Sequence, residues 1–245
     1  MVSSRKIKAI IWDYDGTLVD TRHKNLNVTK NIMQSITETN VLEFPALRSL
    51  ESYYLANRRT SNWRELYRKE FNLTEKQIDE AGRLWTEYQL DDDTEVDFYE
   101  GIEAVICDLV EFPHGIVSQN SRTSIAENLE KKSLLPYFKH IVGYEEVDLK
   151  KQKPEPDGLL SCIEKLSMPG AGCVCYIGDH ETDVQCVRAA NRKLQEENAN
   201  VQIFSIGACY DSGPNTSTWN FRPDYEAQEV EEILQIVDHI GRSLI

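Results

Sequence analysis

Residues 7–21, IKAIIWDYDGTLVDT, decide the fold that this sequence predicts. An isoleucine-rich apolar run ends at Asp13, and Asp15 and Gly16 follow it. An apolar run stopped by a turn signal is typical of a buried strand in a parallel sheet. We therefore expect Asp13 to be the last strand residue and Asp15 to lie in the turn. Such sheets bind ligands beyond the carboxyl ends of their strands, which is where both carboxylates should be.

Two carboxylates this close repel each other, and the repulsion raises the pKa of one of them unless a cation lies between them. A hard, oxygen-liganded ion such as Mg²⁺ would resolve the conflict. One carboxylate could then act as a nucleophile or as a general acid and base. An ordinary turn is the alternative interpretation, because Asp and Gly favour turns in any case.

The length and charge of the chain limit the possible functions. Its 245 residues suffice for one large domain, or for one domain with a smaller one inserted. Lysine and arginine total 27 against 41 aspartate and glutamate, a net charge of −14. Such a surface repels phosphate backbones, so we expect no nucleic-acid partner. A phosphate site would need local positive charge of its own.

The sequence predicts a cytoplasmic protein with no membrane partner. The N-terminus runs into the first strand without a cleavable apolar region, and no stretch approaches the roughly 18 apolar residues of a membrane span. Four of the six cysteines lie in apolar surroundings, which suits reduced core residues. We expect a monomer or a homodimer.

Residues 22–90 have apolar side chains at helical spacing, with Pro45 and Gly82 as the only proline and glycine. Thr74 and Gln77 match a capping box at a helix start. We predict an all-helical inserted domain of about four helices.

Strands and helices alternate after about residue 99. We predict strands at 114–119, 140–144, 173–179 and 201–207, and helices at 101–112, 122–132, 157–166, 181–198 and 227–244. This alternation is typical of an α/β fold with a Rossmann-like parallel sheet covered on both faces.

Further polar residues fall at the ends of these strands. Ser118, with Gln119 beside it, could donate to a phosphoryl oxygen, although serine commonly ends strands. Lys153 stands among prolines just ahead of a helix, which suits neutralising a bound phosphate. A solvated surface lysine is the alternative. Asp179 ends the apolar run CVCYIGD as Asp13 ends the first one, and Asp183 opens the next helix. Turn chemistry alone does not explain this combination.

In order and spacing these residues resemble the haloacid dehalogenase superfamily. The motifs are Asp13-Tyr14-Asp15-Gly16-Thr17, Ser118, Lys153-Pro154-Glu155-Pro156-Asp157 and Gly178-Asp179-His180-Glu181-Thr182-Asp183. The resemblance covers the whole chain, including a helical cap inserted after the first motif, as in the phosphoglycolate-phosphatase-like branch. It implies a cap at 22–94 and a core at 1–21 and 95–245. It also implies a Mg²⁺-dependent phosphatase for a small phosphorylated metabolite, either phosphoglycolate-like or a sugar phosphate.

The resemblance also implies roles for the motif residues. Asp13 would attack phosphorus to form an aspartyl-phosphate, with Asp15 as general acid and base. Mg²⁺ would be held by the Asp13 carboxylate, the Asp15 carbonyl and Asp179, and Asp183 would orient the waters of the metal.

The phosphoryl oxygens would be bound by Ser118, Gln119 and Lys153. His180 stands where the family most often has serine. We interpret His180 as a structural or substrate-tuning residue rather than a metal ligand.

The same residues bear on other possible functions. Dehalogenases and phosphonatases of the superfamily lack the second aspartate, so Asp15 argues against both. A phosphomutase shares all four motifs and stays open, as does a non-catalytic binding protein, although that usually requires loss of a motif aspartate. Cys186 and Arg192 match the spacing of cysteine phosphatases, but they fall in a predicted helix without a glycine loop. We attribute that match to chance.

The arginine-rich segment 58–64 belongs to the predicted cap. Arg58, Arg59 and Arg64 could contact substrate anions or could form a solvated helix face, and the sequence leaves both open.

Overall fold

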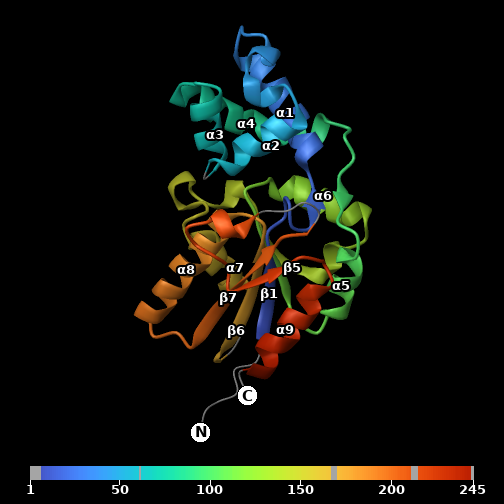
Figure 1. The fold of residues 1–245 in the computed structure, drawn as a ribbon, viewed down its shortest axis with the longest axis vertical. Coiled ribbons are helices and arrows are strands. Elements are labelled where there is room, and N and C mark those ends of the chain that lie inside the picture. The colour runs from blue at the N-terminus through green and yellow to red at the C-terminus, as the bar shows by residue number, and fades with distance from the viewer. Residues whose placement is uncertain (1–6, 61, 167–169, 211–214, 244–245) are drawn as a thin grey trace. The chain divides into compact units, whose positions relative to one another are not determined.

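The structure is a computed structural model that describes residues 7–60, 62–166, 170–210 and 215–243 (Figure 1). It divides into two compact units, whose boundaries fall between residues 19 and 20 and between residues 97 and 98. The chain crosses both boundaries within two short paired strands, β2 (Val19–Asp20) and β3 (Asp97–Phe98). The first and last parts of the chain form an α/β unit, and the middle part forms a helical unit.

The α/β unit contains a six-stranded parallel sheet with strand order β5-β4-β1-β6-β7-β8. Its strands are β1 (Ile7–Trp12), β4 (His114–Val117), β5 (Phe138–Val142), β6 (Gly172–Gly178), β7 (Val201–Ala208) and β8 (Tyr225–Ala227). Its helices are α5 (Ile102–Asp108), α6 (Arg122–Lys131), α7 (Asp157–Lys165), α8 (Glu181–Glu196) and α9 (Glu232–Ser243). Single 3-10 turns lie at Leu135–Tyr137, Tyr144–Glu146, Leu149–Lys151 and Thr216–Thr218. The predicted α/β class is confirmed.

Helices cover both faces of the sheet. Figure 1 shows α7 and α8 on one side of the strands and α5 and α9 on the other. Successive strand residues point to opposite faces, so Ala9 and Ile11 of β1 share one face. They pack there with Leu159 of α7 and Cys186 of α8. Since all strands run parallel, their carboxyl ends form one edge, and the loops that follow the strands meet there.

Several predicted elements were wrong in their bounds: the helix predicted at 101–112 spans Ile102–Asp108, and the strand predicted at 114–119 ends at Val117. Residues 225–227 form β8, an edge strand that was not predicted, and the last helix, predicted to begin at residue 227, begins only at Glu232. The three residues are too few to show a strand pattern, and β8 exists because it pairs with Ile206–Ala208. The strand predicted at 140–144 begins at Phe138, which pairs with His114, and ends at Val142. Residue 244, predicted to end the last helix, lies outside the described residues.

The helical unit consists of α1 (Arg22–Ile36), α2 (Leu50–Arg58), α3 (Trp63–Glu70) and α4 (Glu75–Asp91), with 3-10 turns at Val41–Glu43 and Pro45–Leu47. Its core contains buried side chains from all four helices, among them Ile32, Tyr53, Tyr67 and Ile78. The capping box of Thr74 and Gln77 is present at the start of α4 and confirms that prediction. None of the described helices is long and apolar enough to cross a bilayer.

His114 links two central strands of the sheet. It is buried at the start of β4, its ring stacks on that of Trp12, and the Trp12 indole Nε1–H donates to its Nδ1 at 2.9 Å. The His114 Nε2 lies 3.0 Å from the carbonyl oxygen of Leu109. Neutral histidine with its proton on Nε2 satisfies both contacts. Burial lowers the pKa of His114 below its usual value, because desolvation disfavours the charged ring.

This environment predicts a pH-dependent stability. The unfolded pKa is about 6.5, so below that pH the unfolded chain binds a proton that the folded chain resists. The free energy of unfolding should therefore fall as the pH drops below about 6.5. His114→Phe leaves the Trp12 N–H unpaired and should cost about 1–3 kcal/mol at neutral pH. The difference in the free energy of unfolding between His114→Phe and wild type should become smaller in acid. Denaturant unfolding at several pH values measures it. A pH-independent difference would contradict this account.

Candidate active site

Asp13 follows β1 directly and is anchored by the sheet. The strand ends at Trp12, one residue earlier than expected, but the Asp13 backbone N–H still donates to Ile177 O of the neighbouring β6 at 2.7 Å. Only 7% of Asp13 is exposed to solvent. The position of this carboxylate therefore follows from the pairing of β1 with β6.

The turn after Asp13 is held by backbone hydrogen bonds and by a distant tyrosine. Gly16 adopts a φ of 77° and its N–H donates to Val19 O at 2.9 Å. The Tyr210 hydroxyl, buried beyond the end of β7, donates to the Thr17 carbonyl oxygen. Tyr210 packs edge-on against Tyr99 with 5.1 Å between ring centroids. Nothing in the sequence near Tyr210 marks this contact, because its partner lies 193 residues away.

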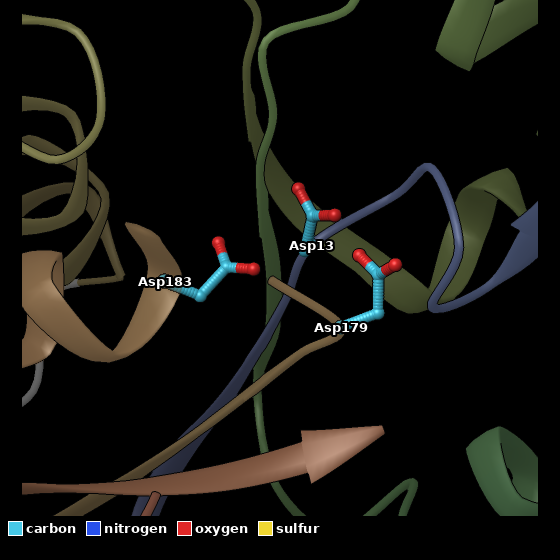
Figure 2. A group of neighbouring side chains, drawn as sticks. All are labelled: Asp13, Asp179 and Asp183. Atoms are coloured by element: carbon cyan, nitrogen blue, oxygen red, sulfur yellow. The ribbon is translucent and has the colours of Figure 1, made fainter. Parts of the chain in front are cut away.

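Three carboxylates converge at the edge of the sheet. Figure 2 shows Asp13 after β1, Asp179 after β6 and Asp183 near the start of α8, with their carboxylates facing a common space. Each offers an oxygen, and these oxygens all lie within 4.8 Å of one another. The structure thus brings together three of the four predicted aspartates through their side chains.

Two glycines make this approach possible. A Cβ atom at Gly16 would lie 2.4 Å from an Asp179 oxygen, and one at Gly178 would lie 2.5 Å from the Asp183 carboxyl carbon. Real Cβ atoms do not approach this closely, so the carboxylates occupy space that any other residue would fill. Gly16 also needs its left-handed backbone, which is costly for other residues.

Lys153 bridges two of the carboxylates. Its Nζ donates to Asp13 Oδ1 at 2.6 Å and to Asp183 Oδ1 at 2.8 Å. Its side chain is only 6% exposed, so it is no solvated surface lysine, whereas Lys150 and Lys151 are exposed. Burial lowers the pKa of the Lys153 ammonium, but the two aspartates outweigh burial and raise it overall. Lys153 therefore remains protonated and offsets part of the buried negative charge.

The loop that carries Lys153 is tied down on both sides. Gln119 Nε2 donates to the Lys153 carbonyl oxygen at 2.9 Å, and Gln152 Nε2 donates to Tyr144 O at 2.8 Å. The side chain of Gln119 thus holds the lysine loop. The amides place Lys153 without contacting its charged end.

Asp15 faces the loop after β4. Its Oδ1 accepts from Asn120 Nδ2 at 3.1 Å, and its Oδ2 lies 3.4 Å from the Ser118 hydroxyl, a long contact. The Ser118 hydroxyl also accepts from the Asn120 backbone N–H at 3.0 Å. Ser118 and Asp15 are therefore brought together as expected from their strand ends. Asn120, buried beside them, was not identified, although it follows Ser118 and Gln119 in a polar run after the strand.

His180 is the capping residue just before helix α8. Its Nδ1 accepts from the Thr182 backbone N–H at 3.3 Å, and its own N–H donates to Asp183 Oδ2 at 3.1 Å. Together these bonds make a capping box. The Nδ1 of His180 thus serves the helix start, and a substrate-tuning role of this residue stays a prediction.

The match to cysteine phosphatases does not form a site. Cys186 and Arg192 lie in the same helix, α8, and Cys186 is buried with its thiol toward Glu155 O at 3.3 Å. Burial raises the pKa of the Cys186 thiol to about 12. A nucleophilic cysteine needs a lowered pKa, because the thiolate is the reactive form.

In the helical unit, Arg64 pairs with Glu75 at 3.0 Å and with Asp79 at 2.7 Å. The charge of Arg64 is therefore balanced by carboxylates of the helical unit itself. Ser61, in the same predicted segment, lies outside the described residues.

Arg58 and Arg59 pair with no carboxylate among the described residues. Arg58 donates to the Tyr54 hydroxyl at 2.6 Å and stacks over that ring at 5.2 Å, and Arg22 lies 5.5 Å from the centre of the same ring. Arg59 is exposed and donates to Leu55 O. Contact with substrate anions stays a prediction for both.

Comparison with known proteins identifies a family. The family described as haloacid dehalogenase-like hydrolase matches residues 10–195, which is more than half of the chain. Pyrophosphatase PpaX of Listeria innocua is 23% identical over 238 residues, covering 95% of this chain and 97% of that protein.

Solved structures show the same fold. A predicted phosphoglycolate phosphatase from Haemophilus somnus matches with a TM-score of 0.67 at 14% identity, over 94% of this chain and 97% of its own. CbbY from Rhodobacter sphaeroides, in complex with xylulose 1,5-bisphosphate, matches with a TM-score of 0.67 at 16% identity, over 92% of this chain and 96% of its own.

The contact between Gly16 and Asp179 predicts the effect of a methyl group. Gly16→Ala should lower the free energy of unfolding by more than the roughly 1–2 kcal/mol that a left-handed backbone costs alone, because Asp179 must also move. Gly170→Ala is a matched control, since Gly170 has a φ of 78° and a Cβ there would meet nothing within 4 Å. Denaturant unfolding of both variants measures the difference. Equal losses would mean that Asp179 moves aside freely.

Proposed function

The chain belongs to the haloacid dehalogenase-like hydrolase family, and we propose that it is a Mg²⁺-dependent phosphatase of small phosphorylated metabolites. The observation that carries this proposal is the group formed by Asp13, Asp179 and Asp183, two of which, Asp13 and Asp183, pair with the buried Lys153. Carboxylates and an ammonium at one sheet edge suit a dianionic phosphoryl group with a divalent cation. The reaction would proceed through a phosphorylated aspartate.

The donor set fits Mg²⁺. Three carboxylates offer hard oxygens within 4.8 Å of one another, and Lys153 supplies a single positive charge against them. We propose that Asp13, the Asp15 carbonyl and Asp179 hold the ion, and that Asp183 orients its waters. The ion, when bound, supplies Lewis-acid neutralisation of phosphoryl charge.

Asp13 is the proposed nucleophile. Lys153 engages Asp13 Oδ1, whereas Oδ2 accepts no hydrogen bond from the described residues. Attack by a carboxylate oxygen on phosphorus forms the O–P bond of the aspartyl-phosphate as the bond to the leaving alkoxide breaks. Burial keeps the carboxylate poorly hydrated and its geometry fixed, which favours attack once substrate is bound.

Asp15 is the proposed general acid and base. It gives a proton to the leaving alkoxide and then takes one from the water that hydrolyses the aspartyl-phosphate, which restores Asp13 and releases phosphate. Asn120 contacts one Asp15 oxygen and Ser118 the other, and together they orient the carboxyl group.

Phosphoryl oxygens would be bound by Lys153, Ser118 and Gln119. The net charge of −14 repels an anionic substrate, so binding depends on local positive charge. Lys153 would provide part of it at the site and the bound cation the rest, because one ammonium does not balance three carboxylates. Gln119 would bind a phosphoryl oxygen from the loop after β4. Its side chain donates to the Lys153 carbonyl oxygen and so links this loop to the loop of Lys153.

Relatives suggest which substrates to test. They carry the names pyrophosphatase and phosphoglycolate phosphatase, and one solved relative holds a sugar bisphosphate. We propose a phosphoglycolate-like compound or a sugar phosphate as the substrate, and we include pyrophosphate in the panel of compounds to be tested.

The helical unit is the proposed cap of this family branch. Release of inorganic phosphate distinguishes a phosphatase from a phosphomutase, and inactivity on the whole panel would favour a binding protein.

The metal assignment predicts a strict cation requirement. Phosphate release should stop in EDTA and return when Mg²⁺ is added in excess. Ca²⁺ should substitute poorly, because its larger and looser coordination shell misplaces the attacking carboxylate. A colorimetric phosphate assay measures all three conditions. Full activity in a rigorously chelated sample would contradict the assignment.

The two aspartates should fail in different ways. Asp13→Asn removes the nucleophile, so turnover should fall to background. Asp15→Asn keeps the nucleophile but lacks the acid and base. With an aryl phosphate, whose leaving group needs little protonation, Asp15→Asn should release a burst of about one phenol per enzyme and then stall.

The stalled variant should carry an acid-stable phosphate that hydroxylamine removes. Rapid-quench kinetics and mass spectrometry measure the burst and the modified residue. Phosphoprotein formed equally well by Asp13→Asn would show that the nucleophile is another residue.

A further inference from the structure

Tyr176 places a hydroxyl inside an otherwise apolar strand. All seven residues of β6 are buried, and Tyr176 is completely so, paired with Ile11 on one side and Ser205 on the other. Burying a hydroxyl is unfavourable unless it makes a hydrogen bond. The function proposed above assigns no role to this residue.

The hydroxyl of Tyr176 is directed at Asp183. It lies 3.0 Å from Asp183 Oδ1 and 3.3 Å from the carbonyl oxygen of Val117. A hydroxyl has one proton, and the carboxylate is both the nearer and the stronger acceptor. Burial raises the pKa of Tyr176, so the hydroxyl stays protonated and can only donate to the carboxylate.

This bond completes the set of donors around Asp183. Oδ1 accepts from Lys153 at 2.8 Å and from Tyr176, and Oδ2 accepts from the His180 N–H at 3.1 Å. The donors come from three parts of the chain: the loop before α7, strand β6 and the start of α8. A carboxylate held at both oxygens cannot rotate without losing at least one of these bonds.

Tyr176 also touches the other member of the ion pair. The Lys153 Nζ lies 5.3 Å from the centre of the Tyr176 ring, within the range of a cation–π contact. The ring belongs to the core cluster that includes Val117, Val142 and Leu159, which fixes its orientation. One rigid side chain therefore contacts both charged partners.

We propose that Tyr176 is a positioning residue of the active site, which orients the Asp183 carboxylate with its hydroxyl and supports Lys153 with its ring. This inference rests on the proposed Mg²⁺ site, because the orientation of Asp183 matters through the ion and its waters. Removing a residue that hydrogen-bonds to a metal-binding side chain typically lowers metal affinity or activity by about 10- to 100-fold.

The test is Tyr176→Phe, which removes the hydroxyl and keeps the ring. Mg²⁺ affinity is measured by calorimetric titration of the chelator-treated protein without substrate. We expect it to fall about tenfold. Tyr53→Phe is a matched control, because the Tyr53 hydroxyl is buried in the helical unit and lies 2.9 Å from Thr29 Oγ1. The control should lose stability but keep the Mg²⁺ affinity of the wild type.

A double-mutant cycle separates positioning from general structural damage. If Tyr176 acts through Asp183, the effect of Tyr176→Phe on Mg²⁺ affinity should disappear in an Asp183→Asn background. Tyr176→Leu, which loses both hydroxyl and ring, should weaken Mg²⁺ binding at least as much as Tyr176→Phe and serves as the test if the phenylalanine variant does not fold. Wild-type affinity in a folded Tyr176 variant, or an undiminished effect beside Asp183→Asn, would overturn the inference. Failure of the wild type to bind Mg²⁺ would instead overturn the proposed metal site.

Discussion

The Lys153 ammonium holds together carboxylates that would otherwise repel one another at the carboxyl edge of the sheet. Its bonds to Asp13 and Asp183 are both buried, and one lysine charge faces at least three aspartates. Burying charges is unfavourable unless they are paired and their remaining hydrogen-bonding atoms are satisfied. The register of β1 against β6 and the two glycines make this pairing possible. The register places the strand ends side by side, and the glycines leave room for Asp179 and Asp183.

Much of the polar chemistry around the site serves to position charged groups. Gln119 and Gln152 bind backbone carbonyls of the loop at Lys153 and its neighbourhood, and Asn120 binds Asp15. His180 closes the first turn of α8 while its N–H binds Asp183. Side chains that are themselves held by hydrogen bonds lose little entropy when substrate arrives, so the charged groups are already placed for electrostatic stabilisation.

The helical unit shows a different use of charge. Arg64 is joined to Glu75 and Asp79 on the surface of its own unit, while Arg58 and Arg22 gather at the ring of Tyr54. Exposed ion pairs contribute little to stability, and the buried aromatic and aliphatic core of this unit contributes more. Arg58, Arg59 and Arg64 look alike in the sequence, but they have different surroundings in the structure.

The sequence by itself determined the α/β class, most of the strands and the capping box of Thr74, because hydrophobic periodicity and cap residues act over a few neighbouring positions. It also identified Asp13, Asp15, Asp179 and Asp183 at strand and helix ends. Only the tertiary structure decided that β8 forms, that Lys153 rather than Lys150 or Lys151 is buried, and that Asn120, Tyr176 and Tyr210 reach the site. The contact of Lys153 with Asp13 spans 140 residues, and no local pattern encodes which distant partner a buried polar atom will meet.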